Sequence, residues 1–493
     1  MFERVKGRID DDAIALYYGD AIERSKSSFP VMMKVNQAHV VMLAEQGLIS
    51  RETARRLLET FARMLEAGVE AIRIDPGLED LYTNVERAVL EAAGAEVGGQ
   101  MHMGRSRNDL EPAIARIMAR DALNDIALSI HALAELLAGK AREHAGSVLP
   151  GFTHWQPAQP TTLGHYLIAV VDHLLRDLER LDAAYRRTNR SPLGAAAFNG
   201  TSFAINRLRT AELLGFDGLA ENTLDAAAGV DHWVEAASVL ANHALTLARY
   251  ASDVVRWSMP WLGYVELADG WSDSSSIMPQ KKNPVMAETV RAQAAVATSL
   301  LAGYMEACRT TLEPCRDITV AEGKLWDLFD HVGRMTNITL GFSRGMTVHV
   351  ERMQGQATIG FTAATELADT LVRESGLSFR EAHRVVANIA REVMERGGDS
   401  TIVTAGRVKE AAAAVLGRSI SLTEESVARA LAPGRFVEAR SHAGGPAPAE
   451  VRRMAEQRMA ELAKHRQLIE ERFAQCQRGD AMLAEAMKRV LQG

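Results

Sequence analysis

The sequence predicts an all-α protein built around a bundle of long helices. Aromatic residues make up only 5% of the 493 residues, while Ala, Leu, Arg and Glu are abundant, and this composition favours helix over strand. Several long segments repeat apolar residues at three- and four-residue steps, the period of one helix face. A single helix cannot shield its own apolar face from water, so each of these long helices must pack against others. This favours a bundle that includes helices from other copies of the chain over an all-α core within one chain.

The charge balance and the cysteines narrow the class of protein further. The chain carries 56 Lys and Arg against 63 Asp and Glu, a net charge of −7 that argues against nucleic-acid or anionic-membrane partners. The 47% hydrophobic content excludes wholesale disorder. Residues 1–13 lack the apolar core of a signal peptide, and no run of about 18 apolar residues follows, so we expect no membrane span. The cysteines are too scattered for a disulfide framework or a metal site and favour a cytoplasmic location; they are Cys308, Cys315 and Cys476.

Residues 1–110 are expected to form an N-terminal helical domain. Short helical patterns broken by Gly and Pro run through this region, among them Ser50–Ala67 and Thr83–Ala93. Thr83 with Glu86 has the spacing of a capping box that opens the second of these helices.

Residues 111–355 are expected to form the central long-helix bundle domain, and residues 356–493 a C-terminal helical domain. One apolar stripe runs along Glu111–Ala145, a helix of roughly 50 Å at 1.5 Å per residue. After Gly355 the helical patterns shorten again. Four more long helices are expected at Thr161–Asn189, Val230–Trp257, Pro284–Thr311 and Lys324–Met353.

Three polar segments between the long helices have a composition that is unusual for connectors. The first is Gly104–Asp109 (GRSRND), at the start of the first long helix. A helix N-terminus presents free N–H groups and the positive end of the dipole, and two arginines beside it suit a carboxylate or a phosphate. The alternative is an ordinary N-cap at Asn108 or Asp109 with solvated arginines.

The second and third segments add groups that can transfer protons and bind anions. Pro150–Pro160 (PGFTHWQPAQP) contains Thr153, a donor to anions, and His154, which can transfer protons near pH 7 but as a lone histidine could equally be structural. Ser272–Pro284 (SDSSSIMPQKKNP), followed by Glu288, combines serines and lysines with apolar anchors that a flexible linker, the alternative, would lack. No dinucleotide, P-loop or zinc-hydrolase motif accompanies them.

The three segments resemble, in order and spacing, the signature regions of the argininosuccinate lyase branch of the fumarase/aspartase superfamily. The resemblance covers nearly the whole chain and implies three mostly helical domains, with central helices that merge into a twenty-helix core of a homotetramer. It further implies active sites assembled from three subunits, no metal or organic cofactor, and a reversible anti-elimination that releases fumarate. The matching strings are Gly104–Asp109, Gly151–Pro160 and Ser275–Pro284 (SSIMPQKKNP), with Ser191–Gly194, Gly360–Glu366 and Phe379–His383.

The resemblance also implies roles for individual residues. Removing a proton beside a carboxylate creates a dianion, so the site must stabilise negative charge. Ser275 would be the base, its alkoxide stabilised by Lys281 and backbone dipoles when the loop closes over the substrate. His154, oriented by Glu288, would assist protonation of the departing nitrogen. The expected substrate-binding residues are Ser106, Arg107, Asn108, Thr153, Ser276, Met278, Asn283, Arg316 and Lys324.

The sequence departs from this branch mainly where the branch holds the amine half of its substrate. An added cation there favours a leaving amine with extra carboxylates, as in the ethylenediamine-N,N'-disuccinate (EDDS) lyases, a side branch of the family. The alternatives are an authentic argininosuccinate lyase and, more remotely, an inactive structural homologue like the family's lens proteins. The departures are Arg316 for a tyrosine, Ala321 for a glutamine, Asn36, Tyr82, Val285 for an aspartate and Ser274 for a glycine.

Overall fold

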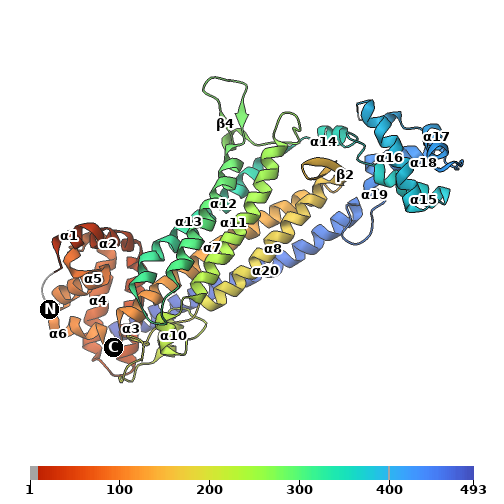
Figure 1. The fold of residues 1–493 in the computed structure, drawn as a ribbon. Helices are drawn as coiled ribbons and strands as arrows, with labels where there is room; N and C mark the ends of the chain where they lie inside the picture. Colours follow the sequence, from red (N-terminus) through yellow and green to blue (C-terminus); the bar gives the residue numbers. More distant parts are fainter. Residues whose placement is uncertain (1–8, 398–399, 493) are drawn as a thin grey trace.

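The computed structural model describes residues 9–397 and 400–492 and shows an elongated, almost entirely helical chain (Figure 1). The N-terminal helices gather at one end, long helices run side by side through the middle, and a small helical lobe lies at the other end (Figure 1). The all-α prediction is confirmed, since the strands among the described residues form only short two-stranded sheets. Residues 1–8, on which part of the signal-peptide prediction depends, lie outside the described residues.

The N-terminal helices pack around one apolar core. The predicted capping box at Thr83 is wrong, because Asp80 caps the helix and its side chain accepts the Thr83 backbone N–H at 2.7 Å. With that donor already satisfied, Thr83 lies inside the first turn. The helices are α1 (Asp11–Ala13), α2 (Gly19–Ser25), α3 (Phe29–Glu45), α4 (Arg51–Ala67), α5 (Leu81–Ala93) and α6 (Ala95–Gly98).

The long helices form one bundle whose apolar stripes meet in a shared core. Leu133, Leu174 and Leu240, from three different helices, are fully buried there. The first four long helices lie within a few residues of their predicted bounds, because a continuous apolar stripe marks each of them. These helices are α7 (Arg107–Glu143), α8 (Leu163–Thr188), α11 (Asp231–Trp257) and α12 (Val285–Ala307), with the short α9 (Arg207–Leu213) and α10 (Thr223–Ala228) between α8 and α11.

The fifth long helix is displaced from its predicted position. Helix α13 (Arg316–Gly345) begins eight residues before Lys324 and ends eight before Met353. After Gly345, β6 (Thr347–Val348) pairs with β3 (Val265–Glu266). The β-branched residues of this pair favour extended backbone where the apolar pattern suggested further helix.

Residues 350–438 form the short helices expected after the bundle, but the chain then returns to it. Helix α20 (Pro448–Gln492), 45 residues long, packs along α7 and α8 and reaches α3 and α4. Its buried stripe is narrow and lies among many charged residues, so the sequence pattern does not predict this long helix. The short helices are α14 (Val350–Gln356), α15 (Ala364–Ser375), α16 (Phe379–Glu395), α17 (Ala405–Leu416), α18 (Glu424–Leu431) and α19 (Pro433–Glu438).

Helix α7 is the one helix of the described residues that is long and apolar enough to cross a membrane by length and composition alone. It packs against α8, α13 and α20, and much of its surface is buried among them. The core helix of a bundle passes the same test, so packing explains its apolar residues.

Candidate active site

The first predicted segment forms the N-terminus of α7. Ser106 is the N-cap: its hydroxyl accepts the Asn108 backbone N–H at 3.3 Å, and its own backbone N–H donates to Asp109 Oδ1 at 2.8 Å. Asp109 Oδ2 accepts two further backbone N–H groups, from Gly194 and Ala196, at 2.8 and 2.9 Å. These bonds tie the helix start to the loop after α8, and the N-cap is neither Asn108 nor Asp109.

Arg107 and Asn108 are held at the same helix start. Arg107 forms an ion pair with Asp80 and approaches Glu79 at 3.4 Å, while Asn108 Nδ2 donates to the Ala197 carbonyl at 3.1 Å. Partial burial opposes the charge on Arg107, but the Asp80 carboxylate outweighs it and raises the pKa of the guanidinium. Both side chains therefore lie where the N–H groups and dipole of α7 favour an anion.

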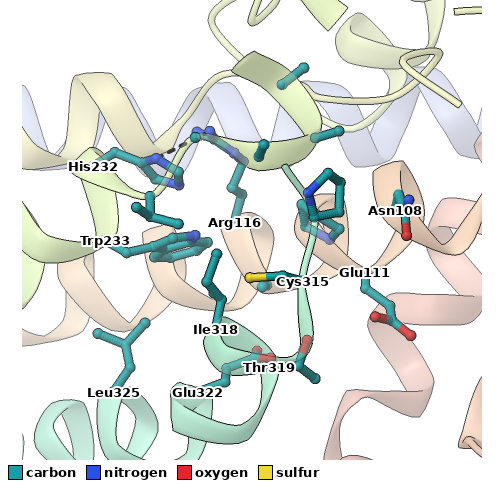
Figure 2. A pocket seen from close by; sticks show the side chains of 18 of the residues that line it. Asn108, Glu111, Arg116, His232, Trp233, Cys315, Ile318, Thr319, Glu322 and Leu325 are labelled. Carbon is teal, nitrogen blue, oxygen red and sulfur yellow. Dashed lines mark hydrogen bonds between the residues drawn. The ribbon is translucent and has the colours of Figure 1, made fainter. Parts of the chain in front are cut away.

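A cavity of about 110 Å³ opens beside Asn108, between the N-terminal ends of α7, α11 and α13 (Figure 2). Two carboxyl groups line this cavity, Glu111 on α7 and Glu322 on α13, and neither belongs to the three polar segments. Enclosure by protein atoms, with the charges of Asp80 and Glu322, raises the pKa of Glu111 to about 7 although solvent still reaches the side chain. Burial also raises the pKa of Glu322, whose Oε1 accepts the Trp326 indole N–H at 3.0 Å.

The wall of the cavity far from Glu111 holds a buried cation (Figure 2). Arg116 Nη1 donates to the carbonyls of Arg187 and Thr188 at 3.0 and 3.1 Å, and Nη2 lies 3.3 Å from His232 Nδ1. Burial lowers the pKa of Arg116 to about 10 and, with the Arg116 charge, that of His232 to about 3. At pH 7 Arg116 is therefore charged and His232 neutral, and the cavity suits a small group that carries both signs of charge.

The residues that depart from the family pattern do not share one environment. Arg316, the first residue of α13, is exposed and its guanidinium lies over the Tyr17 and Tyr18 rings, 5.1 and 5.8 Å from their centroids. Among the described residues it has no ion-pair partner. Lys324, two turns later on α13, is also exposed. Three of the departing residues are instead buried within the chain, namely Asn36, Tyr82 and Ala321.

The second predicted segment is a β-hairpin. β1 (Val148–Thr153) pairs antiparallel with β2 (Gln156–Thr162), and His154 and Trp155 form the two-residue turn. Both have positive φ, 51° and 65°, a conformation that Asn and Gly normally supply in such turns. Thr153 and His154 are exposed at the tip, so the hairpin presents them away from its own chain.

The third predicted segment is a longer hairpin. β4 (Asp273–Ser274) pairs with β5 (Lys282–Asn283), and residues 275–281 form the loop between them. Ser275 Oγ accepts the backbone N–H groups of Ile277 and Met278, at 3.4 and 3.1 Å. Donors aimed at a hydroxyl oxygen favour its ionised form, so this loop is suited to a serine that loses its proton.

The two lysines of the third segment differ in their surroundings. Lys282 Nζ lies 2.8 Å from Glu266 and 2.6 Å from Asp269. Lys281 is exposed and, within the part of the chain that the structure describes, has no ion-pair partner. Lys281 is therefore the lysine available to a bound anion. Glu288 lies half-buried in the first turn of α12.

The three segments do not meet within one chain. Helix α7, 37 residues or about 55 Å at 1.5 Å per residue, separates the first segment from the second, which begins just after α7 ends. The third segment projects from the same end of the bundle as the second, on its own hairpin (Figure 1). Within residues 9–397 and 400–492, Glu288 and His154 form no hydrogen bond or ion pair with each other. A site that uses all three segments needs more than one copy of the chain.

Known proteins match this chain over nearly its whole length. Residues 7–298 match the family model described as Lyase, and residues 361–438 the model described as Argininosuccinate lyase C-terminal. The chain is 41% identical to the argininosuccinate lyase of Methanosarcina barkeri over 470 residues, 94% of each chain. It is 44% identical to that of Halobacterium salinarum over 430 residues, 86% of this chain and 85% of the other. A crystal structure of EDDS lyase in complex with formate matches with a TM-score of 0.89 at 32% identity, covering 100% of this chain and 98% of that one.

Proposed function

The chain belongs to the fumarase/aspartase superfamily, in its argininosuccinate lyase branch, and we propose that this carbon–nitrogen lyase releases fumarate from an N-substituted aspartate whose amine part carries extra carboxylates. EDDS is one such compound. The reaction runs in the cytoplasm, which fits the three free cysteines.

The proposed chemistry rests mainly on the surroundings of Ser275. The Ser275 Oγ accepts two backbone N–H groups, and Lys281 is exposed in the same loop. These groups stabilise the alkoxide that a serine base requires. The alkoxide takes a proton from the carbon beside one carboxylate of the succinyl group, and the electron pair becomes the double bond of fumarate as the C–N bond breaks.

The remaining groups protonate the leaving nitrogen, stabilise the dianion and bind the succinyl carboxylates. His154, directly or through water, gives a proton to the departing nitrogen, and Glu288 from another subunit orients it. Lys281 and Asn283 stabilise the dianion that forms as the proton leaves. The two carboxylates of the succinyl group are held by Ser106, Arg107, Asn108, Thr153, Ser276 and Met278.

A homotetramer brings these groups together. The separation of the three segments supports it, and so do apolar side chains exposed on the bundle: Leu245 of α11 is 50% exposed, and Val296 and Met305 of α12 are 44% and 46% exposed. Apolar side chains exposed on a helix bundle are often covered by further helices. Each active site then takes one segment from each of three subunits.

Arg316 and the cavity support the substrate class. The Arg316 guanidinium, unpaired within the described residues, suits a carboxylate of the amine part, while Glu111 and Glu322 suit a protonated amino group. Lys324 adds a second exposed cation on α13. Argininosuccinate is the alternative substrate, favoured by the identity to argininosuccinate lyases. An inactive structural homologue is disfavoured, because Ser275, His154 and Lys281 are all retained.

Fumarate release distinguishes these possibilities. The protein is incubated separately with EDDS and argininosuccinate, and the ultraviolet absorbance of fumarate is followed, with Ser275→Ala as control. We expect kcat/KM to be higher for EDDS. A higher kcat/KM for argininosuccinate would overturn the proposed substrate. If neither compound yields fumarate, neither is a substrate and the proposed lyase activity is overturned.

A further inference from the structure

The turn that carries His154 has an unfavourable backbone. His154 and Trp155 both have positive φ, and neither is the Asn or Gly that this two-residue turn prefers. Such strained residues persist only where surrounding contacts hold them, and they cluster at functional sites. Trp155 is 75% exposed, so burial of its ring does not account for the conformation.

Arg256, in the last turn of α11, contacts the hairpin on both sides of His154. Its guanidinium carbon lies 4.7 Å from the centroid of the Phe152 ring and 5.3 Å from that of the Trp155 ring. A guanidinium over an aromatic face is attracted by the ring electrons. Phe152 precedes the turn and Trp155 is part of it, so one cation links the bundle to both.

The Arg256 side chain is itself fixed by the bundle. Its Nη2 donates to Asp253 Oδ1 at 2.8 Å, one turn earlier on α11, and Asp253 Oδ2 accepts the Tyr166 hydroxyl of α8 at 2.7 Å. Tyr166 in turn packs edge-on against Trp257, with ring centroids 4.6 Å apart. Two helices of the rigid core thus determine where the guanidinium lies.

We propose that Arg256 is a positioning residue for His154, which it holds in the orientation that delivers a proton to the departing amine. This inference rests on the proposed function of His154. Arg256 needs no contact with substrate for this role, because it acts through the Phe152 and Trp155 rings. Misplacement of a catalytic group by about 1 Å can cost on the order of a hundredfold in rate, which sets the expected size of the effect.

A double-mutant cycle tests the proposal. Arg256→Met, which keeps the length of the side chain but removes its charge, is made in the wild-type and His154→Asn backgrounds, and kcat and KM for fumarate release are measured. We expect Arg256→Met to lower kcat by roughly ten- to a hundredfold in the wild-type background, to change KM little, and to add no loss in the His154→Asn background. Arg249→Met is the matched control on the same helix, where Arg249 is exposed, and it should retain wild-type kcat.

The outcomes separate this inference from the proposed function. An equal loss from Arg256→Met in both backgrounds, or no loss in the wild-type background, would overturn the positioning role while leaving His154 as the proton donor. Full activity of His154→Asn alone would overturn both. If Arg256→Met fails to assemble, Trp155→Leu removes the other half of the contact without changing α11, and the same cycle applies.

Discussion

The two ends of helix α7 are built in opposite ways. At its N-terminus, Ser106, Arg107 and Asp109 are capped, paired or buried against their own chain. Beyond its C-terminus, the hairpins present His154 and Lys281 outward, and neither has an ion-pair partner among the described residues. The contrast teaches that one end, the receptor end, is organised within its own chain as an anion receptor would need to be, while the other presents groups whose partners, in the proposed homotetramer, lie on neighbouring subunits.

The largest effect is expected at the exposed end. Ser275→Ala removes the base but no core contact, so elimination should fall by about 10² to 10⁴ while assembly is unchanged. Steady-state fumarate release and size-exclusion chromatography measure the two properties. Ser276→Ala is the comparison and should lower activity far less, because it removes one contact to a substrate carboxylate but leaves the base in place. The reverse pattern, an active Ser275→Ala and an inactive Ser276→Ala, would assign the base to Ser276.

An intermediate effect is expected beside the anion receptor. Arg316→Tyr removes the exposed cation above Tyr17 and Tyr18, and a charged hydrogen bond to substrate is worth about 1.5–3 kcal/mol. The ratio of kcat/KM for EDDS to that for argininosuccinate should therefore fall by roughly ten- to a hundredfold. An unchanged ratio would show that Arg316 does not contact the amine part.

The smallest effect concerns the stability of the receptor end. The pKa of Glu111 is raised from 4.5 to about 7, so between these pH values the folded chain binds more protons than the unfolded chain. Its stability therefore decreases as pH rises through this window. Glu111→Gln should raise the Tm above about pH 7 and leave it nearly unchanged near pH 4.5. Glu135→Gln, at an exposed position on the same helix, is the control for thermal unfolding. A Tm gain that is the same at both pH values would contradict the assigned shift.

The sequence was sufficient for features that depend on local periodicity. The stripes of α7, α8, α11 and α12 predicted helices close to those observed, because apolar residues recur at helical spacing along each of these segments. Helix α20 was missed because its narrow stripe lies among charged residues on a long exposed surface. Its role depends on packing against helices more than 300 residues earlier in the chain, which no local pattern contains.

In the candidate site, too, some features could be predicted from local sequence and others depend on the folded chain. The three polar segments were recognisable as sequence strings. Their structures, a helix cap and two hairpins, were not, because prolines are uncommon in paired strands and the two hairpin segments contain several of them. Glu111 could have been noticed, since it lies three residues after Asn108 and hence on the same face of α7. Glu322 reaches the same cavity from α13, a juxtaposition that exists only in the folded chain.

The central claim, that one chain cannot complete the site, is tested by mixing two inactive variants. Asn108→Ala damages the receptor end of α7 and His154→Asn the opposite end, so each variant retains the segment that the other lacks. After subunit exchange verified by mass spectrometry, hybrid tetramers should recover up to roughly a quarter of the wild-type activity, because some sites then combine two intact segments. No recovery in verified hybrids would contradict the account and place the whole site within one chain.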